Sequence, residues 1–298
     1  MSLPTPAKRR RVIVNTDAKN EADDQYAIVH ALLTPMFDLR GIIPAHFGER
    51  RTDRSLEESA EEVDLLLRLM DLQGTVAVAN GAARALPDGR TPIDSPGARL
   101  IIEEALREDA GPLFVAFLGP LTDMASALLL EPAIAERDVT VVWIGGAPYG
   151  GKLPRGGNAE FNLSNDIPAA NVVVGSGIDV WQIPQSTYCM ISVGYAELEE
   201  KVRPHGRIGA YLVDQLLEHN TEHHPEPIES RPLGDTPAIG LMISPVSAEW
   251  REQEPVRFTQ RGGYEAARTG SRIRVAEAID ARFMLEDFFA KLKAFARG

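Results

Sequence analysis

Short apolar runs alternate along the chain with longer stretches in which apolar residues recur every three or four positions. The short runs are typical of buried β-strands, and the longer stretches are typical of amphipathic helices. The expected strands are 12–14, 39–45, 75–79, 113–118, 139–144 and 178–183, and the expected helices between them are 25–33, 55–72, 98–108, 124–130 and 168–174. This order predicts an α/β protein with a mostly parallel, doubly wound (Rossmann-like) sheet and helices on both faces.

The last third of the chain is more helical. We expect a helix around 208–216, a loop or lid over 220–234, a helix beginning at Asp235, a pair of short strands at 256–258 and 271–275, and a closing helix at 281–295. Nothing in the composition marks a linker. The sequence therefore predicts one domain over 11–298, preceded by a flexible lead-in over 1–10.

Composition narrows the class of protein. The chain has 298 residues, 44% of them hydrophobic and 25% charged, which is typical of a globular protein with a sizeable core. The net charge of −12 argues against nucleic-acid or anionic-membrane partners, because both require a basic surface. The basic run 8–11 is interpreted as a solvated lead-in to the first strand, and no apolar run is long enough for a signal peptide or a membrane span. The expected location is the cytoplasm.

The single cysteine, Cys189, cannot form an internal disulfide. It follows an expected strand and lies among apolar residues, so a small buried hydrophobic role is favoured over a nucleophilic one.

Three carboxylates gather where the first strand leads into the first helix. Asp17 ends the strand, and the adjacent Asp23 and Asp24 begin the helix. In open α/β sheets, ligands bind at the carboxyl ends of strands. Clustered acids repel one another unless a cation lies among them. One interpretation is a cation site; the other is that Asp23 caps the helix and Asp24 stabilises its first turn.

Later segments offer further polar side chains. Asp235 begins a late helix, where it is either a plain N-cap or a fourth carboxylate for a hard cation such as Ca²⁺. Asn158 and Asn162 lie in a glycine-rich stretch that favours turn-forming asparagines. Glu160 sits there between small and apolar residues, where a carboxylate needs a specific reason.

Four stretches occur together in the order that identifies a known family. They are Asn15-Thr16-Asp17 with Asp23-Asp24, Leu118-Gly119-Pro120-Leu121-Thr122-Asp123, Ala159-Glu160-Phe161-Asn162 with Asp166, and Gly234-Asp235-Thr236-Pro237-Ala238. With these motifs the chain resembles the inosine-uridine-type nucleoside hydrolases over roughly 11–241, as a divergent member.

The resemblance implies a fold, a cofactor and a reaction. It implies that Asp17, Asp24, Asp235 and the backbone carbonyl of Leu118 bind Ca²⁺, whose bound water attacks the anomeric carbon of a ribonucleoside or related riboside. It implies that Asp17 is the general base. The residues that face the ribose are implied to be Asp23, Glu160 and Asn162, with help from Asn158. Family members are often homodimers or homotetramers.

The chain departs from the family pattern at four places. Asn15 replaces a usual aspartate, and the loop 18–22 is about two residues longer than usual. His46 stands where the family offers an asparagine to the sugar, and is the candidate to replace it. Gly234 stands where many members carry the histidine that helps the base leave, which is worth roughly a hundred- to ten-thousand-fold. The candidates to replace that acid are His223, His224 and Tyr264.

Two other functions remain open at this stage. A metal-dependent phosphohydrolase could use the same carboxylates, but the haloacid-dehalogenase type needs Asp-x-Asp, and here the strand ends in Asn15-Thr16-Asp17. No Walker-type loop is present. A non-catalytic nucleoside- or sugar-binding protein on the same scaffold is compatible with Gly234 and the longer loop.

Overall fold

A computed structural model describes residues 9–108, 110–149, 159–223, 226–267 and 271–298. Its centre is a seven-stranded sheet with the order β2-β1-β3-β4-β5-β11-β8. The strands are β1 (Arg10–Thr16), β2 (Phe37–Pro44), β3 (Leu113–Phe117), β4 (Val139–Ile144), β5 (Asp179–Ile183), β8 (Ala248–Gln253) and β11 (Ile273–Ile279). All pairs are parallel except β11 with the edge strand β8. The predicted mostly parallel α/β sheet is confirmed.

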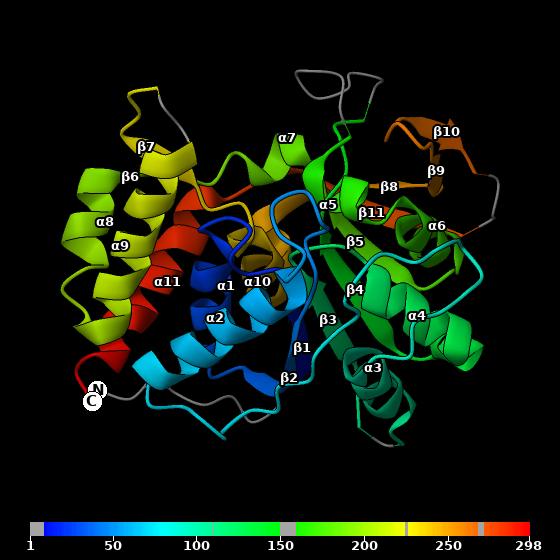
Figure 1. Ribbon diagram of the computed structural model, residues 1–298, viewed down its shortest axis with the longest axis horizontal. Coiled ribbons are helices and arrows are strands. Elements are labelled where there is room, and N and C mark those ends of the chain that lie inside the picture. Colours follow the sequence, from blue (N-terminus) through cyan, green and yellow to red (C-terminus); the bar gives the residue numbers. More distant parts are fainter. Residues whose placement is uncertain (1–8, 109, 150–158, 224–225, 268–270) are drawn as a thin grey trace.

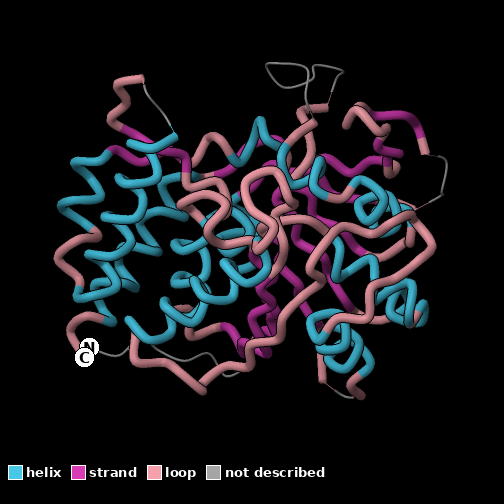
Figure 2. The backbone as a smooth tube through the Cα atoms, viewed as in Figure 1, coloured by secondary structure: helices cyan, strands magenta, loops and turns pink. Residues whose placement is uncertain are grey.

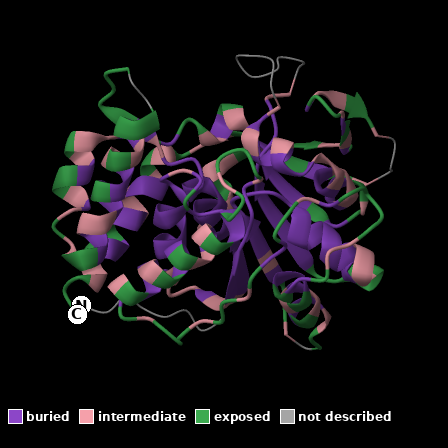
Figure 3. Ribbon diagram, viewed as in Figure 1, coloured by how far each residue is buried: buried purple, intermediate pink, exposed green. Residues whose placement is uncertain are grey.

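Helices cover both faces of this sheet (Figures 1 and 2). One apolar cluster joins one face to α1 (Asp24–Leu32), α2 (Ser55–Leu69), α9 (Gly206–His223), α10 (Thr236–Ile243) and α11 (Ala281–Phe295). A second joins the other face to α3 (Pro96–Leu106), α4 (Thr122–Leu130) and α6 (Ile167–Gly175). Side chains alternate between the two clusters, so that Val12 and Val14 lie in the first and Ile13 in the second. Burial on both faces is why the strands are continuous apolar runs (Figure 3).

The position of β1 in the sheet creates a crevice. The chain leaves β1 through α1 on one face to reach β2, whereas α3, which precedes β3, lies on the opposite face. The connections therefore diverge between β1 and β3, and a doubly wound sheet binds ligands at such a switch point. Asp17 directly follows β1, and Leu118 directly follows β3.

Shorter elements complete the fold. They are α5 (Phe161–Asn165), α7 (Gln185–Tyr188), α8 (Tyr195–Lys201), the 3₁₀ turns η1 (Pro132–Glu136) and η2 (Pro245–Ser247), and the strands β6 (Ser192–Gly194), β7 (Ser230–Pro232), β9 (Val256–Phe258) and β10 (Tyr264–Ala266). In the described part of the chain, no helix has the length and hydropathy needed to cross a membrane.

Three expected elements differ from the structure. The stretch 75–79 makes one isolated bridge, between Val78 and Ile42, although backbone hydrogen bonds keep the chain beside β2 from Ala77 to Gly81. Strands β9 and β11 do not pair with each other: β9 pairs with β10, and β11 joins the central sheet. The expected loop 220–234 holds the end of α9 and strand β7, and residues 224–225 lie outside the described range.

The basic run and the cysteine were also misjudged. Arg11 is buried in β1 and forms an ion pair of 2.6 Å with Glu104, and Arg10 already belongs to that strand. The run is therefore not solvated at these two positions, while most of the expected lead-in, residues 1–8, lies outside the described range. Cys189 is exposed, because it follows the short helix α7 rather than a strand.

Candidate active site

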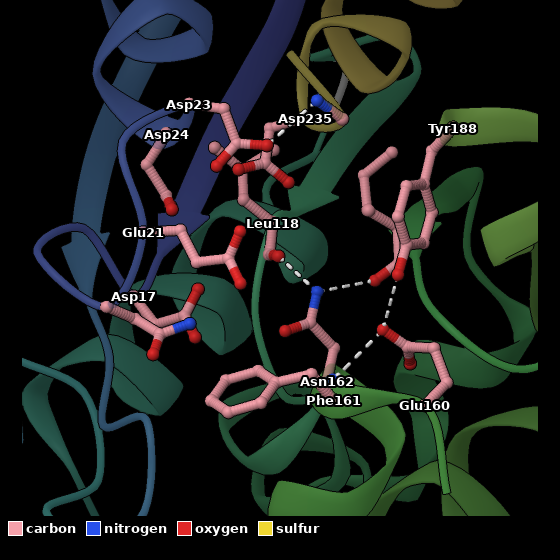
Figure 4. Close-up of a pocket in the computed structure, with 13 residues that line it drawn as sticks. Asp17, Glu21, Asp23, Asp24, Leu118, Glu160, Phe161, Asn162, Tyr188 and Asp235 are labelled. Carbon is pink, nitrogen blue, oxygen red and sulfur yellow. Dashed lines mark hydrogen bonds between the residues drawn. The ribbon is translucent and has the colours of Figure 1, made fainter. Parts of the chain in front are cut away.

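A pocket opens at the crevice between the carboxyl ends of β1 and β3. It encloses a cavity of about 60 Å³, and its lining residues come from segments far apart in the sequence (Figure 4). They are Asp17, Asn20, Glu21, Asp23, Asp24, Leu118, Ile144, Glu160, Phe161, Asn162, Tyr188, Gly234 and Asp235. Of the nine predicted site residues, seven line this pocket, and the structure thus brings together acids from both ends of the chain.

Asp23, Asp24 and Asp235 form the centre of the pocket. One carboxylate oxygen from each lies within 4.8 Å of the others, and all three residues are buried. Asp23 and Asp235 occupy N-cap positions, yet neither side chain makes a capping hydrogen bond. Instead, Asp23 Oδ2 accepts a hydrogen bond of 2.8 Å from the Gly234 amide, and Asp24 accepts one from the Thr16 hydroxyl. Helix capping therefore does not explain Asp23 or Asp235, whereas Asp24 does lie in the first turn of α1.

Burial and mutual repulsion disfavour the charged form of the three carboxyl groups in this cluster. Burial, followed by repulsion from Glu21 and Asp24, raises the pKa of Asp23 to about 8. Burial also raises the pKa of Asp24 to about 6. The pKa of Asp235 rises through burial and the charges of Asp23, Asp24 and Asp17. Among the described residues that line the pocket there is no lysine, arginine or histidine. The charge of Arg231, which lies outside the lining, offsets only part of the rise in the pKa of Asp23. A buried triad of oxygen donors of this kind fits a hard metal ion.

Asp17 lies beside the triad but outside it. In the described chain, no set of three metal-binding side chains within 4.8 Å includes Asp17, although the charges of Asp24 and Asp23 raise its pKa after burial does. Its Oδ2 is buried and makes no hydrogen bond. A Cβ added to Gly119 would lie 2.6 Å from Asp17 Oδ1, so glycine leaves the room for this carboxylate. A carboxylate oxygen without a hydrogen-bond partner beside the triad is available to a ligand.

Glu160 has a structural reason for its burial. Oε2 accepts hydrogen bonds from the amides of Gly146 (2.8 Å) and Leu163 (3.0 Å). Oε1 accepts from the Asn162 amide (3.1 Å) and the Tyr188 hydroxyl (2.9 Å). Four donors match the four acceptor positions of a carboxylate. Glu160 therefore caps α5 and fixes Tyr188, and its charge is satisfied within the protein.

Asn162 fixes the second wall of the pocket. Its Nδ2 donates to the carbonyls of Leu118 (2.6 Å) and Ile144 (2.9 Å), which end two neighbouring strands. Figure 4 shows the Asn162 amide oxygen on the side that faces the acids. Leu118 presents only its backbone carbonyl, and that carbonyl keeps one acceptor position beyond the bond to Asn162.

Two predicted residues do not line the pocket. His46 is buried elsewhere: its Nε2 lies 2.9 Å from Thr122 Oγ1, and its Nδ1 accepts from the Gly48 amide at 3.2 Å. Both ring nitrogens thus have partners in the fold. Asn158 lies outside the described residues.

The candidates to replace the leaving-group acid are also elsewhere. His223 is exposed at the end of α9, and the Tyr264 hydroxyl donates to the Ala147 carbonyl; neither lines the pocket. His224 lies outside the described residues.

Sequence reasoning missed five residues that line the pocket: Asn20, Glu21, Ile144, Phe161 and Tyr188. Asn20 and Glu21 belong to the longer loop 18–22. The extra length of that loop is the feature of the sequence that could have indicated them. Asn20 is 3% exposed, and its Oδ1 has no hydrogen-bond partner. Glu21 forms an ion pair with Arg231 at the edge of the pocket. Tyr188 carried no local signal, because its position depends on the turn after β5.

Several contacts hold the 18–22 loop in place. The Ser59 hydroxyl donates to the Ala18 carbonyl (2.9 Å), and Gln215 Nε2 donates to the Ala22 carbonyl (2.9 Å). Lys19 adopts a positive φ of 85°, and its ammonium lies 3.4 Å from a carboxylate oxygen of Glu62; Lys19 does not line the pocket. The loop is thus anchored by α2 and α9 with Asn20 and Glu21 turned inward.

Solved structures with this architecture define the class of protein. A plant nucleoside hydrolase, PpNRh1, superposes with a TM-score of 0.78 at 20% identity, covering 96% of this chain and 99% of that one. The purine-preferring ribonucleoside hydrolase from Gardnerella vaginalis gives a TM-score of 0.79 at 20% identity, covering 97% and 99%. The fold is that of the nucleoside hydrolases.

Sequence comparison identifies the family. The profile of the "Inosine-uridine preferring nucleoside hydrolase" family matches residues 12–286, and the chain belongs to that family. It is similar to the pyrimidine-specific ribonucleoside hydrolase RihA of Citrobacter koseri, with 28% identity over 250 residues, 75% of this chain and 76% of the relative. RihA of Salmonella typhimurium is 26% identical over 259 residues, 78% and 79% of the two chains. The protein is therefore a divergent, nucleoside hydrolase-type enzyme that acts on N-glycosyl bonds.

Proposed function

We propose that the protein hydrolyses the N-glycosidic bond of a ribonucleoside or related riboside with the help of Ca²⁺. The observation that carries this proposal is the buried triad Asp23, Asp24 and Asp235, with the orphaned Asp17 beside it, at the switch point of the sheet. Asp17, Asp24, Asp235 and the Leu118 carbonyl would hold the ion. When bound, the cation holds and acidifies the attacking water.

Residues of this chain accept the proton, contact the ribose and stabilise the transition state. Asp17 accepts the proton of the water, for which its unpartnered Oδ2 is available. Asp23 faces the ribose hydroxyls from the acidic wall. On the opposite wall, Asn162 offers its amide oxygen, and Glu160 acts on the ribose through Asn162 and Tyr188, which it holds in place. The transition state carries positive charge on the sugar, and the surrounding carboxylates stabilise it.

Purine and pyrimidine ribosides both remain within the proposed substrate class, because the names of the relatives cover both. We place the enzyme in the cytoplasm and expect a homodimer or homotetramer. Light scattering of the purified protein measures its assembly, and a monomer at working concentration would contradict that expectation.

A panel of substrates tests the proposed activity. Bound metal is measured first, and then p-nitrophenyl riboside, inosine, uridine and a phosphate ester are offered to the protein. We expect turnover of ribosides, a loss of at least a hundred-fold in Asp17→Asn, and no release of phosphate. A protein that binds metal without turning over any riboside would contradict the proposal.

That last outcome would favour the second candidate, a non-catalytic riboside-binding protein. The observation in its favour is Gly234, which leaves the pocket without a side chain at the place of the family's leaving-group acid. Calorimetry with inosine separates the two candidates, since only a binding protein gives a stable complex with unreacted nucleoside.

A further inference from the structure

The space at Gly234 is occupied rather than empty. A Cβ added to Gly234 would lie 2.9 Å from Cδ2 and 3.5 Å from Cε2 of Tyr188, and 3.2 Å from Oδ2 of Asp23. The Tyr188 ring therefore fills the volume that a side chain at position 234 would need. The two residues act as a pair: the aromatic ring fits because position 234 is glycine.

Tyr188 does not offer a proton to a leaving group in its place. Its hydroxyl donates to Glu160 Oε1 at 2.9 Å, and that bond completes the four bonds of the Glu160 carboxylate. Burial, together with the charge of Glu160, raises the pKa of the Tyr188 hydroxyl well above its ordinary value. The proton is thus directed toward a carboxylate that binds it strongly.

The lining of the pocket is strongly acidic. Six carboxyl side chains line it: Asp17, Glu21, Asp23, Asp24, Glu160 and Asp235. Glu21 is paired with Arg231 and Glu160 accepts four hydrogen bonds, and the summed formal charge of the other four carboxylates still exceeds that of one divalent cation. Two aromatic rings, Phe161 and Tyr188, complete the lining, and aromatic faces attract cations. The centroid of the Phe161 ring lies 6.0 Å from the guanidinium carbon of Arg50 and 6.0 Å from that of Arg51, so this ring already attracts cations.

We infer that the substrates suited to this site are N-ribosides whose heterocycle already carries a positive charge, such as pyridinium or N-alkylated purine ribosides. The inference rests on the proposed hydrolase function and specifies its substrate class. Acidic and aromatic walls attract such a heterocycle, and its departure requires no acid.

The bond changes balance without a proton donor. Water oxygen bonds to the anomeric carbon as the C–N bond breaks, and the bonding pair moves to the ring nitrogen. That pair neutralises the positive charge, so the heterocycle leaves as a neutral base. The water proton passes to Asp17 and then to solvent. A neutral nucleoside would instead release an anion unless an acid protonated it.

A matched pair of substrates tests the inference on the full-length, metal-loaded protein. Guanosine and N7-methylguanosine differ by one methyl group and the positive charge that it creates. We expect kcat/KM for N7-methylguanosine to exceed that for guanosine by at least a hundred-fold, the lower end of what an acid contributes. Nicotinamide riboside should be turned over similarly, with a KM that rises with salt because opposite charges are screened. p-Nitrophenyl riboside is uncharged and releases the stable p-nitrophenolate anion without an acid, and it is the control for the hydrolytic site.

The possible results separate the two levels of the proposal. Turnover of guanosine within about three-fold of N7-methylguanosine would overturn the inference and leave the proposed hydrolase intact. Turnover of p-nitrophenyl riboside together with no turnover of either cationic riboside would also overturn it. Absence of turnover with every riboside would overturn the proposed function itself.

Discussion

Asn15 Nδ2 donates a hydrogen bond of 3.0 Å to Oδ2 of Asp123, and both residues are buried. Asp123 also accepts from the Ser95 hydroxyl (2.6 Å) and the Ala82 amide (2.9 Å). Its pKa is raised by burial, which these three donors partly offset. Asn15 does not line the pocket. The amide nitrogen at position 15 thus serves a buried carboxylate beneath the site, while Asn15 Oδ1 is buried without a hydrogen-bond partner.

The contact between Asn15 and Asp123 predicts a loss of stability that a second substitution should reverse. Asn15→Asp places a second carboxylate against Asp123, so we expect a loss of about 3 kcal/mol or more in the free energy of unfolding. The double variant Asn15→Asp/Asp123→Asn restores one amide and one carboxylate. It should recover most of that loss in urea denaturation.

Equal stability of Asn15→Asp and the wild type would contradict this account of the pair. So would a double variant no more stable than the single one. Asn15→Ala serves as the control, because it removes the donor without adding a charge.

The 18–22 loop predicts a contribution to cation affinity. Asn20 Oδ1 is a buried amide oxygen without a partner in a pocket built of oxygen donors, and Ca²⁺ accepts such ligands. Asn20→Ala should weaken Ca²⁺ binding by about ten-fold or more in calorimetric titration.

Asn165→Ala is the matched control for Asn20. Asn165 also has a buried, unpartnered side-chain atom, Nδ2, but it lines a separate groove beside α6. Its replacement should leave Ca²⁺ affinity unchanged. An equal loss in both variants would show that Asn20 acts through general destabilisation rather than through the site.

The raised pKa values predict how the metal-free protein responds to pH. The unfolded chain releases the Asp23 proton near its ordinary value of 3.8, whereas the folded protein retains it to about pH 8. Between these values the native state binds more protons, so the free energy of unfolding falls as pH rises. Bound Ca²⁺ favours the ionised carboxylates, and the gain in Tm on adding Ca²⁺ should therefore grow from pH 5 to pH 8.

The gain in Tm compares the Ca²⁺-bound and the metal-free protein at the same pH. The pH dependence of groups far from the pocket therefore cancels in this comparison. Asp24→Asn should flatten the dependence. A Ca²⁺-induced gain that is constant over this range would contradict the assignment of the cluster as a cation site.

The pairing of Tyr188 with Gly234 predicts a gain of activity. Gly234→His alone should lower activity, because the new side chain collides with the tyrosine ring. Tyr188→Ala/Gly234→His removes the obstacle and supplies a general acid, which should raise kcat/KM for inosine by about a hundred-fold relative to Tyr188→Ala alone. Steady-state assays with p-nitrophenyl riboside show whether the water-activating residues are intact. No rise with inosine in an otherwise active double variant would contradict the role given to position 234.

Patterns local in the sequence predicted much of the fold and the acidic wall. The alternation of apolar runs and amphipathic stretches predicted the doubly wound sheet, and the acids after β1 and before α10 were recognised from their positions at element ends. The stretch 75–79 was predicted as a strand from its β-propensity. In the structure it makes a single bridge to β2 and has no partner on its outer side among the described residues. Edge position is a tertiary property, which a local pattern does not contain.

The second wall of the pocket depends on contacts between distant segments. His46 follows a strand at the correct sheet edge, yet its ring turns to Thr122 and Gly48. Tyr188 enters the pocket because α7 turns it toward Glu160 and because Gly234 leaves it room. Side-chain direction after a strand is set by the neighbouring loops, so sequence position alone predicted neither the direction of the His46 ring nor the place of Tyr188 in the pocket.

Metal-dependent turnover of p-nitrophenyl riboside tests most directly whether the acidic cluster holds a cation that hydrolysis requires. We expect that chelation abolishes turnover, that Ca²⁺ restores it, and that Asp24→Asn loses at least a hundred-fold in kcat/KM while remaining folded. Turnover that persists after chelation, or that Asp24→Asn leaves unchanged, would contradict a hydrolase built on the Asp23, Asp24 and Asp235 cluster.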